Sequence, residues 1–263
     1  MKLLSICSSS KGNSTYIGTR EMGIAIDIGC SYKAFCEGLS TIGADISSVK
    51  AILVTHEHTD HIKGLLTLTK RTDIPIYAKE PTLNYLLKHG HVTSTANLRS
   101  TRELREIDFD GEISCFPTPH DVEASVGYLF DFGTQKLGFA TDLGHITDDV
   151  RKNLSGCRTV FIEANYQPER LKGNPNYPSY LKARISSARG HLSNPDSAEF
   201  CAELVKKGTV KLVLGHLSQE NNTPELAYIT VKNRLRAEGL ETERDFTLNV
   251  APVHNKAGEY ISF

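Results

Sequence analysis

The chain has 263 residues, of which 39% are hydrophobic and 23% charged, so the composition is that of a globular protein and excludes a disordered chain. Its 30 basic and 31 acidic residues give a formal net charge of -1, which excludes a strongly cationic protein that coats nucleic acid. No apolar run approaches the roughly 20 residues that a membrane helix needs, and the short run after Lys2 is too brief for a signal peptide. We therefore expect no membrane partner.

The cysteines are spread along the chain and form neither a C-x-x-C pair nor a dense cluster. This distribution argues against a disulfide framework and against a zinc site built on cysteine ligands. We expect a cytoplasmic protein whose six thiols are reduced and mostly buried: Cys7, Cys30, Cys36, Cys115, Cys157 and Cys201.

Short apolar runs that end at a polar residue predict buried strands. In chain order they are Gly23–Asp27, Ala51–Thr55, Leu137–Thr141, Thr159–Ile162 and Lys211–Gly215. Four of them lead into a residue that can bind a metal or transfer a proton. Because sites in layered α/β proteins collect at strand ends and in loops, we expect the functional site at these strand ends.

Helices are expected between the strands, and the alternation predicts an α/β layered domain. One helix is expected over Ile62–Arg71. A second begins after Ser193, with Pro195 in its first turn, and a third begins at Thr223, because serine and threonine are preferred N-caps. Glycines at 208 and 239 are expected to end these two helices.

The segment Thr55–His61 carries three histidines and an aspartate directly after a predicted strand. Imidazole and carboxylate groups are ligands for zinc, iron and manganese. His56 and His58, two residues apart in a turn, can point at one ion. Asp60 and His61, at the start of the next helix, can reach a second ion nearby. Two divalent ions so placed can polarise an ester or phosphoryl oxygen.

A dinuclear site needs more than four ligands, and three further strand-like runs end in suitable residues. His120 follows Phe116-Pro117-Thr118-Pro119, Asp142 follows LGFAT, and His216 follows KLVLG. We expect a first ion to be bound by His56, His58 and His120, and a second by Asp60, His61 and His216, with Asp142 between the two ions. A lone histidine at a strand end is usually a core or surface residue, so we assign no role to His89, His91, His145 and His254.

The order of THEHTDH, His120, Asp142 and His216 resembles the metallo-β-lactamase fold superfamily. This resemblance covers nearly the whole chain and implies one αββα sandwich domain over residues 1–263. It also implies that Asp27, at an early strand end, supports the metal-binding loop from outside the ligand set. The redox branch of the superfamily has glutamate where this chain has His58, so the resemblance implies hydrolysis rather than oxygen reduction.

Four further phrases resemble the YycJ/WalJ branch of the superfamily: SICSSSKGNSTYI, EANY, RGHLSN and LGHLSQENN. That branch is associated with exonuclease-type phosphodiester hydrolysis. The resemblance implies a nucleic-acid substrate, DNA rather than RNA, and two divalent ions that are zinc or manganese. Members of the superfamily share the site while differing in substrate, so a thioester or lactone hydrolase with the same metal pair stays an alternative. A binding protein that kept the metals without catalysis is a third interpretation.

Glu163 and His191 resemble a pair in the tRNA 3′-processing nucleases of the superfamily, where a glutamate after a strand and a histidine before a helix assist the leaving group. A departing alkoxide needs a proton, and a histidine oriented by a carboxylate can supply one. Asp60 is expected to orient the attacking water or to take its proton. In the alternative interpretation, Glu163 caps or pairs locally and His191 binds phosphate or backbone.

The stretch from Arg170 to Pro195 contains no acidic residue and combines basic side chains with tyrosines. Basic groups neutralise phosphates and aromatic rings stack on bases, so we expect a loop that guides a nucleic-acid strand, although a merely solvated basic loop has the same composition. The glycine- and serine-rich turn at 8–14 could present Lys11 to a phosphate. The expected substrate-binding residues are Lys11, Lys182, Arg184, Arg189 and Ser218.

Overall fold

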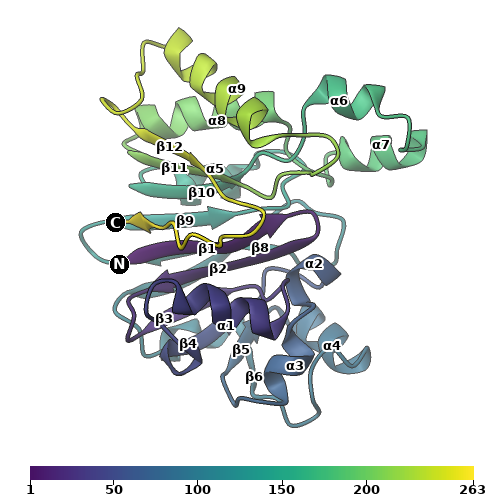
Figure 1. The fold of residues 1–263 in the computed structure, drawn as a ribbon, viewed down its shortest axis with the longest axis vertical. Helices are drawn as coiled ribbons and strands as arrows, with labels where there is room; N and C mark the ends of the chain where they lie inside the picture. The colour runs from purple at the N-terminus through teal and green to yellow at the C-terminus, as the bar shows by residue number, and fades with distance from the viewer. The chain divides into compact units, whose positions relative to one another are not determined.

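The computed structural model describes residues 1–263, which form two compact units. Unit 1 comprises Met1–Ser114, Val122–Ser125 and Pro252–Phe263, and unit 2 comprises Cys115–Asp121 and Val126–Ala251. Each unit is built on one β-sheet with helices packed against it (Figure 1). The prediction of one domain over residues 1–263 stays a prediction.

Unit 1 contains a seven-stranded sheet in the order β13-β1-β2-β3-β4-β5-β6. Strands β1, β2 and β3 are antiparallel neighbours, whereas β3, β4, β5 and β6 run parallel to one another. The strands are β1 (Lys2–Ser9), β2 (Gly12–Gly18), β3 (Gly23–Ile26), β4 (Val49–Leu53), β5 (Ile76–Ala78), β6 (Leu98–Ser100) and β13 (Ile261–Ser262).

The helices of unit 1 contribute buried side chains such as Phe35, Leu65 and Leu86 to a core shared with the strands. They are α1 (Tyr32–Ser40), α2 (Thr59–Ile62), α3 (Leu65–Thr69) and α4 (Glu80–Lys88), with 3-10 turns at Ile46–Ser48 and Thr101–Glu106. The predicted helix over Ile62–Arg71 is wrong, because α2 and α3 are separate. Gly64 lies at the break, where its N–H donates to the Ile28 carbonyl at 2.7 Å and a Cβ would lie 2.4 Å from the Cys30 carbonyl oxygen.

Unit 2 contains a six-stranded sheet in the order β12-β11-β10-β9-β8-β7. Strands β9 to β12 are parallel, and β8 is antiparallel to β9. The strands are β7 (Glu112–Pro117, whose first three residues belong to unit 1), β8 (Val126–Asp131), β9 (Lys136–Ala140), β10 (Thr159–Glu163), β11 (Lys211–Gly215) and β12 (Thr247–Val250).

The helices of unit 2 are α5 (Asp148–Leu154), α6 (Pro168–Gly173), α7 (Ser179–Ile185), α8 (Asn194–Lys206) and α9 (Pro224–Ala237). Helices α8 and α9 pack beside β10 to β12, and α6 and α7 project from the rest of the unit (Figure 1). The predicted guiding loop is therefore corrected, because much of it is helical. Pro168 is the first residue of α6, a position that suits proline, and Pro178 directly precedes α7.

The predicted strands match β3, β4, β9, β10 and β11 to within a few residues. The predicted N-caps are confirmed, since Ser193 Oγ accepts from the Asp196 N–H and Thr223 Oγ1 from the Leu226 N–H, both at 3.2 Å. All six cysteines are free thiols. No helix combines the length and the apolar character needed to cross a membrane.

Candidate functional site

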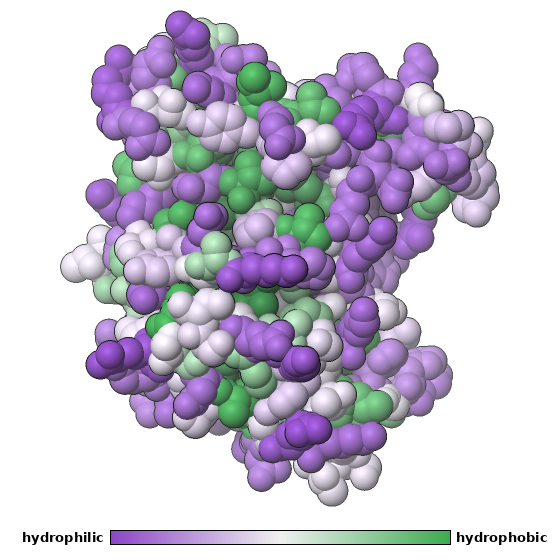
Figure 2. Space-filling view, viewed as in Figure 1, coloured by the Kyte–Doolittle hydropathy of each residue, from purple (hydrophilic) through white to green (hydrophobic).

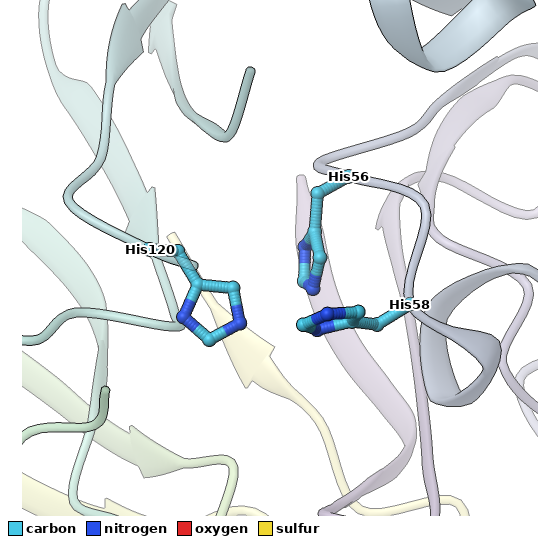
Figure 3. A group of neighbouring side chains, drawn as sticks. All are labelled: His56, His58 and His120. Atoms are coloured by element: carbon cyan, nitrogen blue, oxygen red, sulfur yellow. The ribbon is translucent and has the colours of Figure 1, made fainter. Parts of the chain in front are cut away.

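The loop between β4 and α2 in unit 1 gathers the predicted ligands of the H-x-H-x-D-H motif. His56 and His58 lie in the loop with their ring centroids 4.7 Å apart (Figure 3), and Asp60 and His61 lie in α2. His56 and His61 are fully buried, with ring centroids 4.1 Å apart. The turn that the sequence predicted therefore brings several imidazole groups together within unit 1.

Asp27 lies directly after β3 and contacts this loop and the start of α2 through Thr55 and His61. Its Oδ2 accepts a hydrogen bond from His61 Nδ1 at 2.7 Å, and its two oxygens accept the Thr55 N–H and hydroxyl, each at 2.8 Å. With Nδ1 so engaged, the His61 ring presents Nε2, which lies 3.4 Å from Asp60 Oδ2. Burial raises the pKa of Asp27 above its usual range, although His61 and Thr55 oppose that shift.

Asn13, in β2, is a site residue that the sequence analysis missed. Its Nδ2 donates to Asp60 Oδ2 at 3.2 Å and lies 3.2 Å from His61 Nε2. The sequence analysis had selected Lys11 from the same stretch, and Lys11 lies in the exposed turn between β1 and β2. Lys11 was selected for its positive charge, whereas the Asn13 amide makes the contacts with Asp60 and His61.

The centre of the cluster in unit 2 is Asp142, which follows β9. Its Oδ1 lies 3.6 Å from His120 Nε2, 3.6 Å from His216 Nε2 and 3.7 Å from His191 Nδ1. His120 follows β7 (Figure 3), and His216 follows β11. Asp142, His120 and His216 are all buried. Three strand ends of one sheet thus deliver a carboxylate and two imidazoles to one place.

The nitrogen and oxygen atoms of this cluster are arranged as ligands of a divalent metal ion would be. His120 Nδ1 donates to the Gly190 carbonyl at 3.1 Å and His216 Nδ1 donates to Glu163 Oε1 at 2.8 Å, so both rings present Nε2 toward Asp142. Ligands held tetrahedrally at about 2.1 Å from an ion lie about 3.4 Å from one another. The observed spacings of 3.6 Å are close to that value and longer than hydrogen bonds. Burial lowers the pKa of His120, which favours the neutral ring that binds a metal.

Glu163, at the end of β10, is fully buried and holds two histidines at once. Its Oε1 accepts from His191 Nδ1 and from His216 Nδ1, each at 2.8 Å. Its Oε2 accepts the Leu143 N–H at 2.7 Å and the Leu192 N–H at 3.1 Å. Burial acts to raise the pKa of Glu163, but the charge and hydrogen bond of His191 and the contacts of His216 hold it below its usual range.

The predicted Glu163–His191 pair is therefore present as a hydrogen bond, and the contact to His216 was not foreseen. The side chain of His191 keeps 21% of its surface exposed, whereas Glu163 has none. A partly exposed imidazole on a buried carboxylate has the arrangement of a proton donor held by an orienting group.

Three of these strand-end residues have a left-handed backbone. The φ angles of Asp27, Asp142 and His216 are 57°, 58° and 56°. Such conformations cost roughly 1–2 kcal/mol for residues other than glycine and cluster at functional sites. Each of these residues lies just after a strand, where the chain leaves the sheet and enters a loop.

The predicted substrate-binding residues of unit 2 lie at the surface except for one. Arg184 forms an ion pair of 2.5 Å with Asp121, and Arg189 Nε donates to the His120 carbonyl at 2.8 Å. Lys182 Nζ donates to the Lys172 carbonyl at 2.7 Å. Ser218 is buried, and its Oγ accepts the Asn221 N–H at 3.1 Å, so the loop itself uses this hydroxyl.

Comparison with known proteins gives matches over most of the chain. A family model described as a beta-lactamase superfamily domain matches residues 29–217. The chain is 34% identical over 247 residues to exodeoxyribonuclease YycJ of Bacillus anthracis, spanning 93% of this chain and 92% of that protein. It is 34% identical over 248 residues to exodeoxyribonuclease WalJ of Streptococcus pneumoniae, spanning 92% and 90%. The solved structure of Zn²⁺-bound PqqB from Methylobacterium extorquens matches with a TM-score of 0.70 at 14% identity, covering 100% of both chains. These matches confirm the predicted fold class.

Proposed function

Because the chain belongs to the β-lactamase superfamily, in the branch of the YycJ and WalJ exodeoxyribonucleases, we propose that it is a metal-dependent phosphodiesterase that removes nucleotides from DNA. The observation that supports this most strongly is the cluster in unit 2. There, Asp142 lies among three imidazole nitrogens, and a proton donor, His191, is held by Glu163. Metal ligands beside an oriented acid are the groups that phosphodiester hydrolysis requires.

The proposed cofactor is a pair of divalent ions, zinc or manganese, since both accept nitrogen and oxygen ligands. The proposed ligands are those of the sequence motif: His56, His58, Asp60, His61, His120, Asp142 and His216. When bound, such ions polarise a phosphoryl oxygen and make water a nucleophile near neutral pH. Asp27 and Glu163 support the ligand assignment, because each holds the Nδ1 of a proposed ligand and leaves its Nε2 for the ion.

Each residue around the proposed ions has a separate role in the proposed hydrolysis. Asp60 orients the attacking water or takes its proton, and Asn13 holds the Asp60 carboxylate by a hydrogen bond of 3.2 Å. His191 gives a proton to the departing oxygen of the phosphodiester. Glu163 orients the His191 ring by accepting its Nδ1–H at 2.8 Å, and the contacts of both histidines hold the pKa of Glu163 below its usual range. The backbone N–H groups of Leu143 and Leu192 in turn hold the Glu163 carboxylate.

The proposed substrate surface is the projection formed by α6 and α7, residues 168–185, which we call the arm. Figure 2 shows mainly hydrophilic side chains over this projection. Helix α7 buries none of its residues, and the Tyr180 side chain is 76% exposed, the largest exposure among the large hydrophobic residues of the chain. Basic side chains and an exposed ring together suit a single strand whose phosphates are neutralised and whose bases stack.

Replacing Tyr180 by alanine is expected to raise KM for a single-stranded oligonucleotide by the equivalent of about 1–3 kcal/mol, the contribution of one stacked base. The measurement is steady-state cleavage of oligonucleotides by the metal-loaded protein. The matched control is Tyr260→Ala, which removes another exposed ring, from unit 1, where it lies under the Lys2 ammonium at 4.1 Å. An unchanged KM for Tyr180→Ala would exclude the arm as a stacking surface.

The proposed function is tested by comparing substrate classes on one preparation of metal-loaded protein. Labelled DNA, labelled RNA and bis-p-nitrophenyl phosphate are set against a thioester and a lactone. We expect DNA to be degraded with the highest kcat/KM and the model diester to be cleaved slowly. Rapid thioester or lactone hydrolysis without diester cleavage would contradict the proposal and establish the small-molecule alternative.

We further propose that the protein acts in the cytoplasm and that residues 1–263 work as one functional domain. The location is supported by six free cysteines, which suit a reducing compartment. The single functional domain is supported by relatives that match more than nine-tenths of the chain.

A further inference from the structure

We propose that two adjacent asparagines, Asn221 and Asn222, are positioning residues with separate tasks. Asn222 holds the loops that carry Glu163, His191 and His216 in register, and Asn221 anchors helix α6 at the base of the arm. This inference rests on the proposed function, because it assigns both residues to the same site. Both lie in the loop after β11, five and six residues beyond His216.

Asn222 is 2% exposed, and its side chain connects three loops. Its Nδ2 donates to the Ala164 carbonyl at 2.9 Å and to the Asn165 carbonyl at 3.0 Å, in the loop that follows Glu163. It also pairs head to tail with the amide of Asn194: each Nδ2 lies 2.9 Å from the other residue's Oδ1. Asn194 is fully buried and lies three residues after His191. One amide thus joins the loops of all three residues.

The surroundings fix which way this amide points. The side that faces two backbone carbonyls must be the NH₂ group, because a carbonyl oxygen cannot donate. The opposite atom, Oδ1, accepts the Thr223 N–H at 2.9 Å, at the start of α9. An aspartate at position 222 would keep the shape of the side chain, but it would place a negative oxygen against two carbonyl oxygens.

Further hydrogen bonds join the same three loops. The Asn165 N–H donates to the Leu192 carbonyl at 2.9 Å, and the Ala164 N–H donates to the Gly215 carbonyl at 3.0 Å. Asn165 Nδ2 donates to the His216 carbonyl at 2.7 Å. The two bonds of 2.8 Å from Glu163 to His191 and His216 therefore depend on loops that the Asn222 amide holds together.

Asn221 makes its contacts on the other side, to the two ends of α6. Its carbonyl accepts the N–H of Gln167, the residue before the helix, at 2.9 Å. Its Oδ1 accepts Asn174 Nδ2, from the residue after the helix, at 2.8 Å. Asn174 Oδ1 in turn accepts the Asn176 N–H at 2.9 Å on the path to α7. Asn221 is buried, so these bonds are shielded from water.

The two tasks predict different kinetic losses in Asn222→Asp and Asn221→Ala. Asn222→Asp displaces the proposed metal ligand His216 as well as the proton donor His191. We therefore expect it to lower kcat for bis-p-nitrophenyl phosphate and for an oligonucleotide, by about a hundredfold for the oligonucleotide. A displaced arm weakens only the binding of a long substrate, so Asn221→Ala is expected to raise KM for the oligonucleotide by about tenfold, with the loss falling on KM and not on kcat. Asn222→Ala, which introduces no charge, repeats the first test if the aspartate variant does not fold.

Two controls separate positioning from general destabilisation. Asn255→Asp makes the same change in unit 1, where the Asn255 amide donates to the Ser5 and Glu259 carbonyls at 3.0 and 2.7 Å. Thr209→Val removes a buried hydrogen bond of 2.7 Å to the Cys157 carbonyl, before β11 begins. Both controls are expected to keep the wild-type kcat and KM. Equal losses in kcat for the controls and for the Asn222 variants would overturn the positioning role.

Amide hydrogen exchange on the metal-free protein gives a readout that does not depend on activity. We expect Asn222→Asp and Asn222→Ala to speed exchange of the Leu192 and Asn165 N–H groups by about tenfold, while Thr209→Val leaves them unchanged. Unchanged exchange at both amides in a folded Asn222 variant would overturn the inference. If the wild-type protein cleaves neither substrate while the Asn222 variants show the faster exchange, the proposed function is wrong. Asn222 then remains the residue that holds the three loops together.

Discussion

Asp142→Asn is expected to lower kcat/KM for phosphodiesters by about a thousandfold, equivalent to about 4 kcal/mol of transition-state stabilisation. The reason is the charge at this position: Asp142 Oδ1 lies 3.6 Å from the Nε2 atoms of His120 and His216 and is proposed to hold the ions with them. Asparagine keeps the size of the side chain and tolerates a φ of 58°, so the backbone is not disturbed. The loss therefore reports the missing negative charge.

The measurement pairs activity with metal content. We expect Asp142→Asn to retain less metal after dialysis than the wild type, because a neutral amide binds a divalent ion more weakly than a negatively charged carboxylate does. Asp131→Asn is the matched control, since it removes a carboxylate at the end of β8 that pairs with Lys136 at 2.8 Å. Full metal content together with full activity in Asp142→Asn would contradict the proposed ligand role.

His191→Ala is expected to lower kcat by about 10²- to 10⁴-fold on DNA, the usual contribution of a general acid. The loss depends on the leaving group, because a 3′- or 5′-oxygen needs a proton to depart and p-nitrophenolate departs without one. We therefore expect a loss of less than about tenfold on bis-p-nitrophenyl phosphate. The measurement is the ratio of the two losses, with metal content determined on the same preparation.

The control for His191 is His145→Ala, another histidine of unit 2, which binds the Ala188 carbonyl through Nδ1 at 2.9 Å. It is expected to keep wild-type turnover on both substrates. An equal loss on DNA and on the p-nitrophenyl diester in His191→Ala would show that His191 acts on binding or on the metals rather than on the leaving group.

The features that depend on neighbouring residues could be predicted from the sequence. The caps at Ser193 and Thr223 follow from hydroxyl chemistry within three residues, and the strands from apolar runs. The H-x-H-x-D-H motif is local in the same way, so its loop was recognisable. His120, Asp142 and His216 could be proposed as further ligands because each follows a strand-like run, and the resemblance to a family supported their order.

The features that depend on distant residues could not be predicted. The contact of Glu163 with His216 follows from the parallel register of β10 and β11, in which Glu163 lies opposite Gly215. Asn13 reaches Asp60 across 47 positions of sequence, and the break at Gly64 depends on the Ile28 carbonyl. No local pattern encodes these pairings, because they arise from how strands are placed in each sheet.

The measurement that tests the central proposal most directly is nucleotide release from end-labelled DNA by the purified protein, with Mn²⁺ and Zn²⁺ titrated separately and bound metal quantified. We predict metal-dependent release of nucleotides from DNA, which is lost in Asp142→Asn. A protein that carries two bound ions and releases no product from DNA, RNA or a model diester would contradict it.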